Sequence, residues 1–364
     1  MNIQIMSNII NVGGVEVSQY IGEQSLLFDN PPFIREVASI TGKKEGEGPI
    51  GHLFDKVSND DKFGKDNWDE AESELQRQTL GLLLEKSNMT AKQIRYIYAG
   101  DLLGQLIATS FGLAEYNIPI FGLYGACSTF GEAISLASMA VSAGYASDVV
   151  AMASSHFCSA EKQFRFPLEY GNQRPLSATW TVTGCGAVIV SSDLKNDMSD
   201  TKNKREKRVM IKGITTGRIV DYGIKDSMNM GAAMAPAACN VISQNFKDLS
   251  VDNKYYDLII TGDLGEVGKE ILIDLVKKEG YDITDNVSDC GLKIYDELKQ
   301  DTHSGGSGCG CSAVTFCSYV YKKLVEGKIK RVLFVPTGAL LSPISFNEGR
   351  TVPGIAHGII LEGV

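Results

Sequence analysis

The stretch that decides the fold is residues 125–155, GACSTFGEAISLASMAVSAGYASDVVAMASS. It predicts a turn, then a helix of small and apolar residues that ends at a glycine, then an apolar strand. Residues 306–338, GSGCGCSAVTFCSYVYKKLVEGKIKRVLFVPTG, follow the same order with nearly the same spacing. We therefore expect the chain to contain an internal duplication.

Two further pairs of segments extend the duplication in the same order along the chain. The strands RYIYAGD (95–101) and YYDLIITGD (255–263) both end in Gly-Asp, and a leucine follows each of them. TGCGAVIVSS (183–192) and IAHGIILEGV (355–364) each close a half with an apolar strand. Strands that alternate with helices across short turns predict an α/β fold with buried sheets.

The helix predicted at Gly131–Gly144 indicates how the layers stack. It is almost wholly small or apolar, so we expect it to be buried all round, between two sheets. Its equivalent in the second half would lie in the same layer. The sequence therefore predicts a five-layered αβαβα fold of the α/β class, built from two pseudo-duplicated halves.

Charge-rich stretches mark the predicted boundaries along the chain. The stretch DLKNDMSDTKNKREKR (193–208) has the composition of a solvated connection. We expect an N-terminal half over residues 1–193, a charged linker over 194–208 and a C-terminal half over 209–364. The other charge-rich stretch, Gly42–Asp69, is predicted to be a surface loop.

The composition is that of an ordinary globular protein of 364 residues, 43% of them hydrophobic and 22% charged. A net charge of −9 argues against a broad nucleic-acid-binding surface, so no nucleic acid partner is expected. No apolar run approaches the roughly 20 residues that cross a bilayer, and the first residues lack a signal-peptide pattern. We therefore expect a chain made in the cytoplasm, whose eight cysteines are reduced.

Cys127 stands in the turn that opens the first of the two central helices. Backbone N–H groups converge at such a turn, which would lower the pKa of the thiol and favour a nucleophile. The alternatives are a small residue that lines a ligand pocket and a plain core cysteine, since free cysteine is among the most buried residue types. The residues alone leave these three interpretations open.

This arrangement resembles the thiolase fold of thiolases and β-ketoacyl synthases, in which a nucleophilic cysteine opens the central helix of the first half, as Cys127 does here. Four motifs resemble a narrower family, the stage V sporulation protein AD of spore-forming Firmicutes. These motifs are AGDLLGQ (99–105), ASSHFCSAEKQFRFPLEYGNQRPLSATWTVTGCGA (153–187), THSGGSGCGCSA (302–313) and PGIAHG (353–358). Together they extend over most of the chain and are far more specific than the fold signal.

The sequence departs from the condensing enzymes of this fold at one second-half position. Those enzymes carry a histidine after a strand, in a His-Gln-Ala-Asn type motif, whereas the strand here ends in TGDLGEVG (261–268) and puts Asp263 about there. A carboxylate cannot donate a hydrogen bond to a developing oxyanion, and beside a thiolate it would raise the pKa of the thiol. The resemblance leaves His303 as the candidate for the later His or Asn position.

The resemblance implies a protein that binds dipicolinic acid (pyridine-2,6-dicarboxylate), alone or with calcium, for its uptake into the developing spore. It implies neither catalysis nor a cofactor. It also implies a homodimer, peripheral on the forespore or spore inner membrane, that contacts other stage V sporulation A membrane proteins. Two alternatives stay open: an acyltransferase of the β-ketoacyl synthase type that uses Cys127 and His303, and a purely structural subunit of the membrane complex.

The candidate ligand-binding residues follow from this expectation. Cations and aromatic rings alternate in AEKQFRFPLEYGNQRP (160–175), and a planar dicarboxylate needs both, although a surface or dimer-contact loop would have the same composition. The two aspartates that end equivalent strands would otherwise cap the helices that follow them. The predicted ligand-binding residues are Asp101, Cys127, His156, Lys162, Arg165, Arg174, Asp263 and His303.

Overall fold

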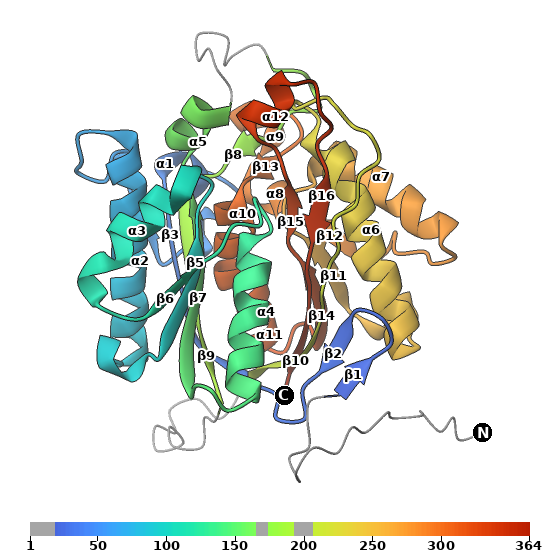
Figure 1. The fold of residues 1–364 in the computed structure, drawn as a ribbon, viewed down its shortest axis with the longest axis horizontal. Coiled ribbons are helices and arrows are strands. Elements are labelled where there is room, and N and C mark those ends of the chain that lie inside the picture. The colour runs from blue at the N-terminus through green and yellow to red at the C-terminus, as the bar shows by residue number, and fades with distance from the viewer. Residues whose placement is uncertain (1–18, 165–173, 193–206) are drawn as a thin grey trace.

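The computed structural model describes residues 19–164, 174–192 and 207–364. Helices and sheets alternate in five layers (Figure 1), with one layer of helices enclosed between the strands of the two halves. Three hydrophobic clusters fill the space between these layers, and the largest of them surrounds the central helices. The predicted αβαβα architecture is confirmed.

The two halves have the same strand order, which confirms the duplication. In each half the first three strands of the order run parallel to one another. The fourth strand runs antiparallel to the third, and the fifth runs antiparallel to the fourth. The first half runs β6 (Ile120–Gly122), β5 (Tyr96–Gly100), β7 (Asp148–Ser155), β9 (Gly184–Ser191), β3 (Phe33–Thr41). The second half runs β12 (Val287–Asp289), β11 (Leu258–Thr261), β14 (Arg331–Val335), β17 (Gly358–Gly363), β10 (Val209–Thr215).

The central layer consists of α4 (Thr129–Ser142) and of α10 (Cys309–Thr315), which continues through a π turn into α11 (Tyr321–Val325). The rings of Phe130, Phe316 and Phe334 pack within 4.8 to 6.2 Å of one another between these helices and β14. The prediction that the first helix is buried on every side is wrong in one respect. Its Glu132, Leu136 and Met139 form a stripe that stays partly open, because no described element covers it.

Helix α10 lies unusually close to β9. A side chain at Gly186 of β9 would collide with the backbone of Ala313 in α10, and one at Gly310 would collide with the backbone oxygen of Gly184. The glycines therefore let the second central helix rest directly on the first sheet, which brings its N-terminal turn near Cys127.

The outer layers complete the fold. Helices α2 (Trp68–Ser87) and α3 (Ile107–Leu113) cover the first sheet, and α6 (Met230–Leu249) and α7 (Gly265–Lys278) cover the second. The shorter helices are α1 (Lys43–Gly46), α5 (Phe157–Phe164), α8 (Gly291–Ile294), α9 (Glu297–Gln300) and α12 (Pro343–Asn347). The shorter strands are β1 (Gln19–Ile21), β2 (Ser25–Leu27), β4 (Lys56–Val57), β8 (Trp180–Thr181), β13 (Gly306–Ser307), β15 (Thr337–Ala339) and β16 (Gly354–Ala356).

Two expectations about connecting segments have different outcomes. The stretch Gly42–Asp69 was expected to be a surface loop, but it contains α1 and β4 and buries Glu45, Phe54 and Phe63. Its few apolar side chains are enough to pack this stretch against the sheet, although most of its residues are polar. Most of the predicted linker lies outside the described residues, so the boundaries at 194 and 208 stay a prediction.

Candidate functional site

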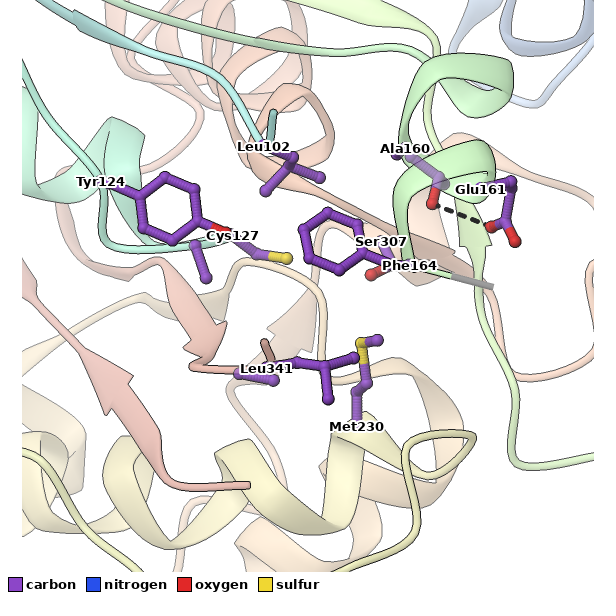
Figure 2. Close-up of a pocket in the computed structure, with 12 residues that line it drawn as sticks. Leu102, Tyr124, Cys127, Ala160, Glu161, Phe164, Met230, Ser307 and Leu341 are labelled. Atoms are coloured by element: carbon purple, nitrogen blue, oxygen red, sulfur yellow. Dashed lines mark hydrogen bonds between the residues drawn. The ribbon is translucent and has the colours of Figure 1, made fainter. Parts of the chain in front are cut away.

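A cavity of about 40 Å³ lies where the turns of both halves meet (Figure 2). A cavity of this volume has room for water, since roughly 10 to 15 Å³ is enough for one molecule. Ligand pockets for small molecules are larger, roughly 300 to 1,000 Å³. The residues that line it are Leu102, Tyr124, Ala126, Cys127, Ala160, Glu161, Phe164, Thr181, Met230, Ser307, Ala339 and Leu341.

A two-stranded ribbon forms one wall of this cavity. Strands β8 and β13 pair in parallel, with Thr181 opposite Ser307 and Trp180 opposite Gly306. Because side chains alternate along a strand, Thr181 and Ser307 face the cavity, while Trp180 faces the other side of the ribbon. The Thr181 hydroxyl also donates a hydrogen bond of 3.3 Å to the buried carboxylate of Glu161.

The carboxyl group of Asp263 lies near the Cys127 thiol and its charge acts on that thiol. Asp263 follows β11 and accepts hydrogen bonds from Thr337 Oγ1 at 2.7 Å, from the Gly308 N–H at 3.0 Å and from Ser307 Oγ at 3.1 Å. A turn of the first half and a turn of the second half therefore bring a thiol and a carboxyl group close together.

Burial determines the protonation of this pair. It raises the pKa of the Cys127 thiol well above its ordinary value, and the charge of Asp263 raises it further. Burial also raises the pKa of Asp263, although the hydrogen bonds that it accepts oppose this. The expectation that the helix turn lowers the thiol pKa is wrong, because desolvation and a neighbouring carboxylate outweigh the converging N–H groups. Cys127 is thus a neutral thiol at physiological pH.

Ser307, rather than His303, is the second-half residue that the structure brings to Cys127. The Nδ1 atom of His303 lies 2.9 Å from the Pro175 carbonyl oxygen, and its Nε2 atom lies 3.2 Å from the Asp301 carboxylate. Sequence reasoning missed Ser307 because a serine in a glycine-rich turn carries no distinguishing signal. The pairing of β13 with β8 is what places it in the cavity.

Asp101 lies away from the cavity, in a second buried polar cluster. Its carboxylate accepts hydrogen bonds from the N–H groups of Leu103 and Thr109, both at 2.8 Å, which is the capping role considered from the sequence. Glu72 of α2, which the sequence did not indicate, is also fully buried, and its carboxylate accepts from the hydroxyls of Ser159 and Ser154. Burial, together with the charge of Asp101, raises the pKa of Glu72 to about 8.

His156 is also held by local contacts. Its Nδ1 atom accepts a hydrogen bond from the Cys158 N–H at 3.2 Å, so its Nε2–H donates to the Asp61 carbonyl oxygen at 2.7 Å. Its ring lies 5.5 Å from that of Trp68, and burial lowers its pKa. His156 is therefore a neutral histidine that packs between α2 and α5, outside the cavity.

The three predicted cations do not gather at the cavity. Lys162 projects from α5 and lies 3.9 Å from the exposed carboxylate of Asp69. Arg174 lies on the other side of the β8–β13 ribbon, next to Trp180. Arg165 lies outside the described residues. Of the eight predicted residues, the structure brings Cys127 and Asp263 together near the cavity, while Arg174 and His303 both contact Asp301 away from it.

The chemistry that this arrangement offers is hydrogen bonding. The cavity presents two hydroxyls, a neutral thiol and a carboxyl group among apolar side chains. Among the described residues, no histidine and no cation line it. All eight cysteines are free thiols.

Comparison with solved structures identifies the type of fold. The chain superimposes on 3-oxoacyl-[acyl-carrier-protein] synthase III from Aquifex aeolicus VF5 with a TM-score of 0.50 and 12% identity, over 91% of this chain and 99% of that one. It superimposes on AbyA1, a tetronic acid condensing enzyme, with a TM-score of 0.56 and 12% identity, over 91% and 100% of the two chains. At these identities the likeness establishes a thiolase-like fold.

Comparison of sequences is more specific. The chain is 42% identical to the stage V sporulation protein AD of Bacillus subtilis (strain 168) over 341 residues, which are 94% of this chain and 97% of that protein. Within the described residues, no helix has the length and apolar character to span a membrane. The family profile of stage V sporulation protein AD matches residues 22–362. The chain therefore belongs to the stage V sporulation protein AD family.

Proposed function

We propose that this protein binds dipicolinate without converting it, as a step in the uptake of dipicolinate into the developing spore. One observation carries the proposal: the cysteine that opens α4 is buried and lines the cavity beside Ser307, where burial and the charge of Asp263 keep it a neutral thiol. A site of this kind binds and orients a ligand but does not attack it. Membership of a sporulation family gives the biological setting.

The walls of the cavity suit a flat ring with polar ends. Leu102, Phe164 and Leu341 provide apolar surface for a pyridine ring. The hydroxyls of Thr181 and Ser307 can donate to its carboxylates once they turn away from Glu161 and Asp263. The present volume is too small for the ligand, so Phe164 and the unbranched side chain of Met230 must move aside. Calcium, where it takes part, arrives with the ligand in this proposal.

Isothermal titration with dipicolinate tests the proposal. We expect saturable binding, and we expect Thr181→Val and Ser307→Ala each to weaken it by about tenfold, the effect of one lost hydrogen bond to a charged group. Ser318→Ala is the matched control, since Ser318 is an equally buried serine that bonds only within its own helix. Absence of binding at millimolar dipicolinate, or equal binding by all variants, would overturn the proposal.

The second candidate function is acyl transfer, favoured by the position of Cys127 at the start of α4 in a fold shared with 3-oxoacyl synthases. Incubation with an acyl-CoA followed by intact mass measurement separates the two. An acyl adduct that Cys127→Ser abolishes would establish the transferase. No adduct, together with dipicolinate binding, is the result we expect.

We also propose that the protein is a homodimer that attaches to the membrane through other stage V sporulation A proteins. Strand β6 pairs only with β5 among the described strands, which leaves one edge of the sheet open. Its Ile120 and Phe121 are half exposed, and Phe121 stacks on Tyr98 at 5.0 Å. A second copy that pairs along the same edge would cover these side chains and extend the sheet.

A further inference from the structure

A cluster of two cations and an indole ring lies across the β8–β13 ribbon from the cavity. The Lys44 ammonium stands 4.1 Å from the ring centre of Trp180, and the Arg174 guanidinium carbon stands 4.8 Å from it. Phe157 stacks on the same indole at 4.0 Å with 8° between the planes. The indole is therefore fixed in place and holds two positive charges close together.

Arg174 is buried but only partly satisfied. Its side chain is 5% exposed, and its Nη2 donates to the backbone oxygen of Asp301 at 2.8 Å and to its carboxylate at 3.1 Å. Its Nε and Nη1 atoms are buried without a hydrogen-bond partner. A buried charged donor that lacks a partner costs more than a neutral one, so two such N–H positions on one guanidinium are unusual.

Charges of both signs lie around this guanidinium, since the carboxyl groups of Glu45, Asp301 and Glu47 act on the neighbouring Lys44. The Lys44 ammonium donates to the backbone oxygen of Gln300 at 2.6 Å, which compensates none of its charge. Burial lowers the pKa of Lys44, and the charge of Arg174 contributes to the lowering. The only carboxylate in contact with Arg174 among the described residues is that of Asp301, whose side chain is 79% exposed. This carboxylate also lies 3.2 Å from Nε2 of His303, and because it is open to solvent an incoming anion can reach and displace it.

We propose that Lys44, Arg174 and Trp180 form a binding site for an anion with two terminal oxygens, either a carboxylate or a phosphate group. The planar fork of arginine matches two such oxygens, and stacking on an indole holds the fork rigid. In the absence of ligand Asp301 occupies one end of the guanidinium. An incoming anion displaces Asp301 and bridges Arg174 to the Lys44 ammonium.

This site is distinct from the cavity at Cys127. Trp180 and Thr181 are consecutive residues of β8 and face opposite sides of the ribbon. Binding at the cluster therefore needs neither Cys127 nor Asp263, and the two sites can be tested separately. The probes chosen below are inorganic phosphate and acetate, so a failure here does not bear on dipicolinate binding at the cavity.

Fluorescence of Trp180 reports on the site directly. The chain has two tryptophans, so the Trp68→Phe variant of the full chain leaves Trp180 as the only indole. We would titrate it with phosphate and with acetate at constant ionic strength. We expect a saturable change with at least one anion, and the anion that binds more tightly identifies the chemistry.

Variants in this background test the named residues. Arg174→Gln and Lys44→Gln should each weaken binding by about tenfold or more, while Asp301→Asn should strengthen it by removing the competing carboxylate. Arg331→Gln is the matched control, since Arg331 also stands over a ring, that of Tyr255, but lies near the carboxylate of Glu362. It should bind as the parent does.

Two results would overturn the proposal. One is no saturable response to either anion in the parent and in Asp301→Asn, which would leave Arg174 a structural clamp between two loops. The other is an equal response in Arg174→Gln, Lys44→Gln and the parent. If Arg174→Gln fails to fold, the Lys44→Gln and Asp301→Asn variants still decide, because they must change the affinity in opposite directions.

Discussion

At the scale of single residues, the pair of Cys127 and Asp263 determines what the site can do. A buried thiol beside a carboxyl group keeps its proton and is a poor nucleophile. Under the proposed function, Asp263 is therefore a residue that keeps the thiol protonated. Its hydrogen-bond partners, Ser307, Thr337 and the Gly308 N–H, hold it in position.

Replacing Asp263 by asparagine should activate the thiol. Without the neighbouring carboxylate the pKa of Cys127 falls, and alkylation at a fixed pH near 8 should speed up by about tenfold for each unit of that fall. The rate can be measured by iodoacetamide labelling with peptide mass mapping. Asp274→Asn, a change on the exposed face of α7, should leave the rate unaltered; a slower or equal rate in Asp263→Asn would refute the role of Asp263.

The residues of the site were only partly predictable. Cys127 and Asp263 could be found because each stands at a turn of the duplicated pattern and at a position that the family resemblance marks. Ser307 and Thr181 could not, since a hydroxyl residue carries no signal and their meeting depends on a short strand pairing between distant segments. The sequence also did not indicate that the side chains of Arg174 and His156 would be buried away from the cavity. Burial depends on packing, which the pattern of a single sequence does not contain.

At the scale of elements, glycine controls how closely the layers approach. Gly186 has no room for a side chain because the backbone of Ala313 in α10 lies against it. Gly186→Ala should therefore lower the free energy of unfolding by about 1 to 3 kcal/mol, the usual cost of overpacking a core. Thermal melting checks this, with Gly104→Ala as the control, because the nearest atoms to a Cβ there are 3.8 Å away. Equal melting of the two variants would contradict the close approach.

The elements themselves were largely predictable from the sequence. The central helices lie where apolar periodicity and glycine punctuation indicate, and so do strands β5, β7, β9, β11, β14 and β17. The open stripe on α4 was missed, because its Leu136 and Met139 look like core residues although they lie at an uncovered face. The burial of side chains in Gly42–Asp69 was not predicted, because the few residues that are buried stand among many charged ones.

At the scale of the whole molecule, buried carboxyl groups tie stability to pH. Burial raises the pKa of Glu72 to about 8 and those of Glu45 and Asp289 to about 7. In the unfolded chain such groups ionise near pH 4. Folding therefore takes up protons at neutral pH, so their contribution to stability is complete below pH 4 and is lost as the pH rises through 7 to 8.

Glu72→Gln should reduce this dependence. We expect the melting temperature of the parent to fall between pH 6 and pH 8. In the variant the free energy of unfolding should depend less steeply on pH, by about one proton or about 1.4 kcal/mol per pH unit. Melting curves across this range measure it. Glu70→Gln, an exposed change on the same helix, should keep the parental slope. An unchanged slope in Glu72→Gln would show that Glu72 is ionised in the folded protein.

The assembly of the whole molecule should depend on the open edge of β6. Phe121→Lys puts a charge into the face that a second copy would cover, so we expect it to convert a dimer into a monomer. Light scattering after size-exclusion chromatography gives the mass of each. Tyr145→Lys, also exposed but outside β6, is the control. A parent that is monomeric at high concentration would contradict the proposed dimer.

The central claim is that a condensing-enzyme fold here holds a neutral cysteine in a ligand-binding cavity. The most direct measurement is the rate at which iodoacetamide modifies Cys127 at neutral pH as dipicolinate is added. We predict a slow rate that dipicolinate slows further, to a saturable limit, because the ligand covers a thiol that is already unreactive. A fast rate that dipicolinate does not change would show a reactive nucleophile outside any dipicolinate site, and would contradict the account.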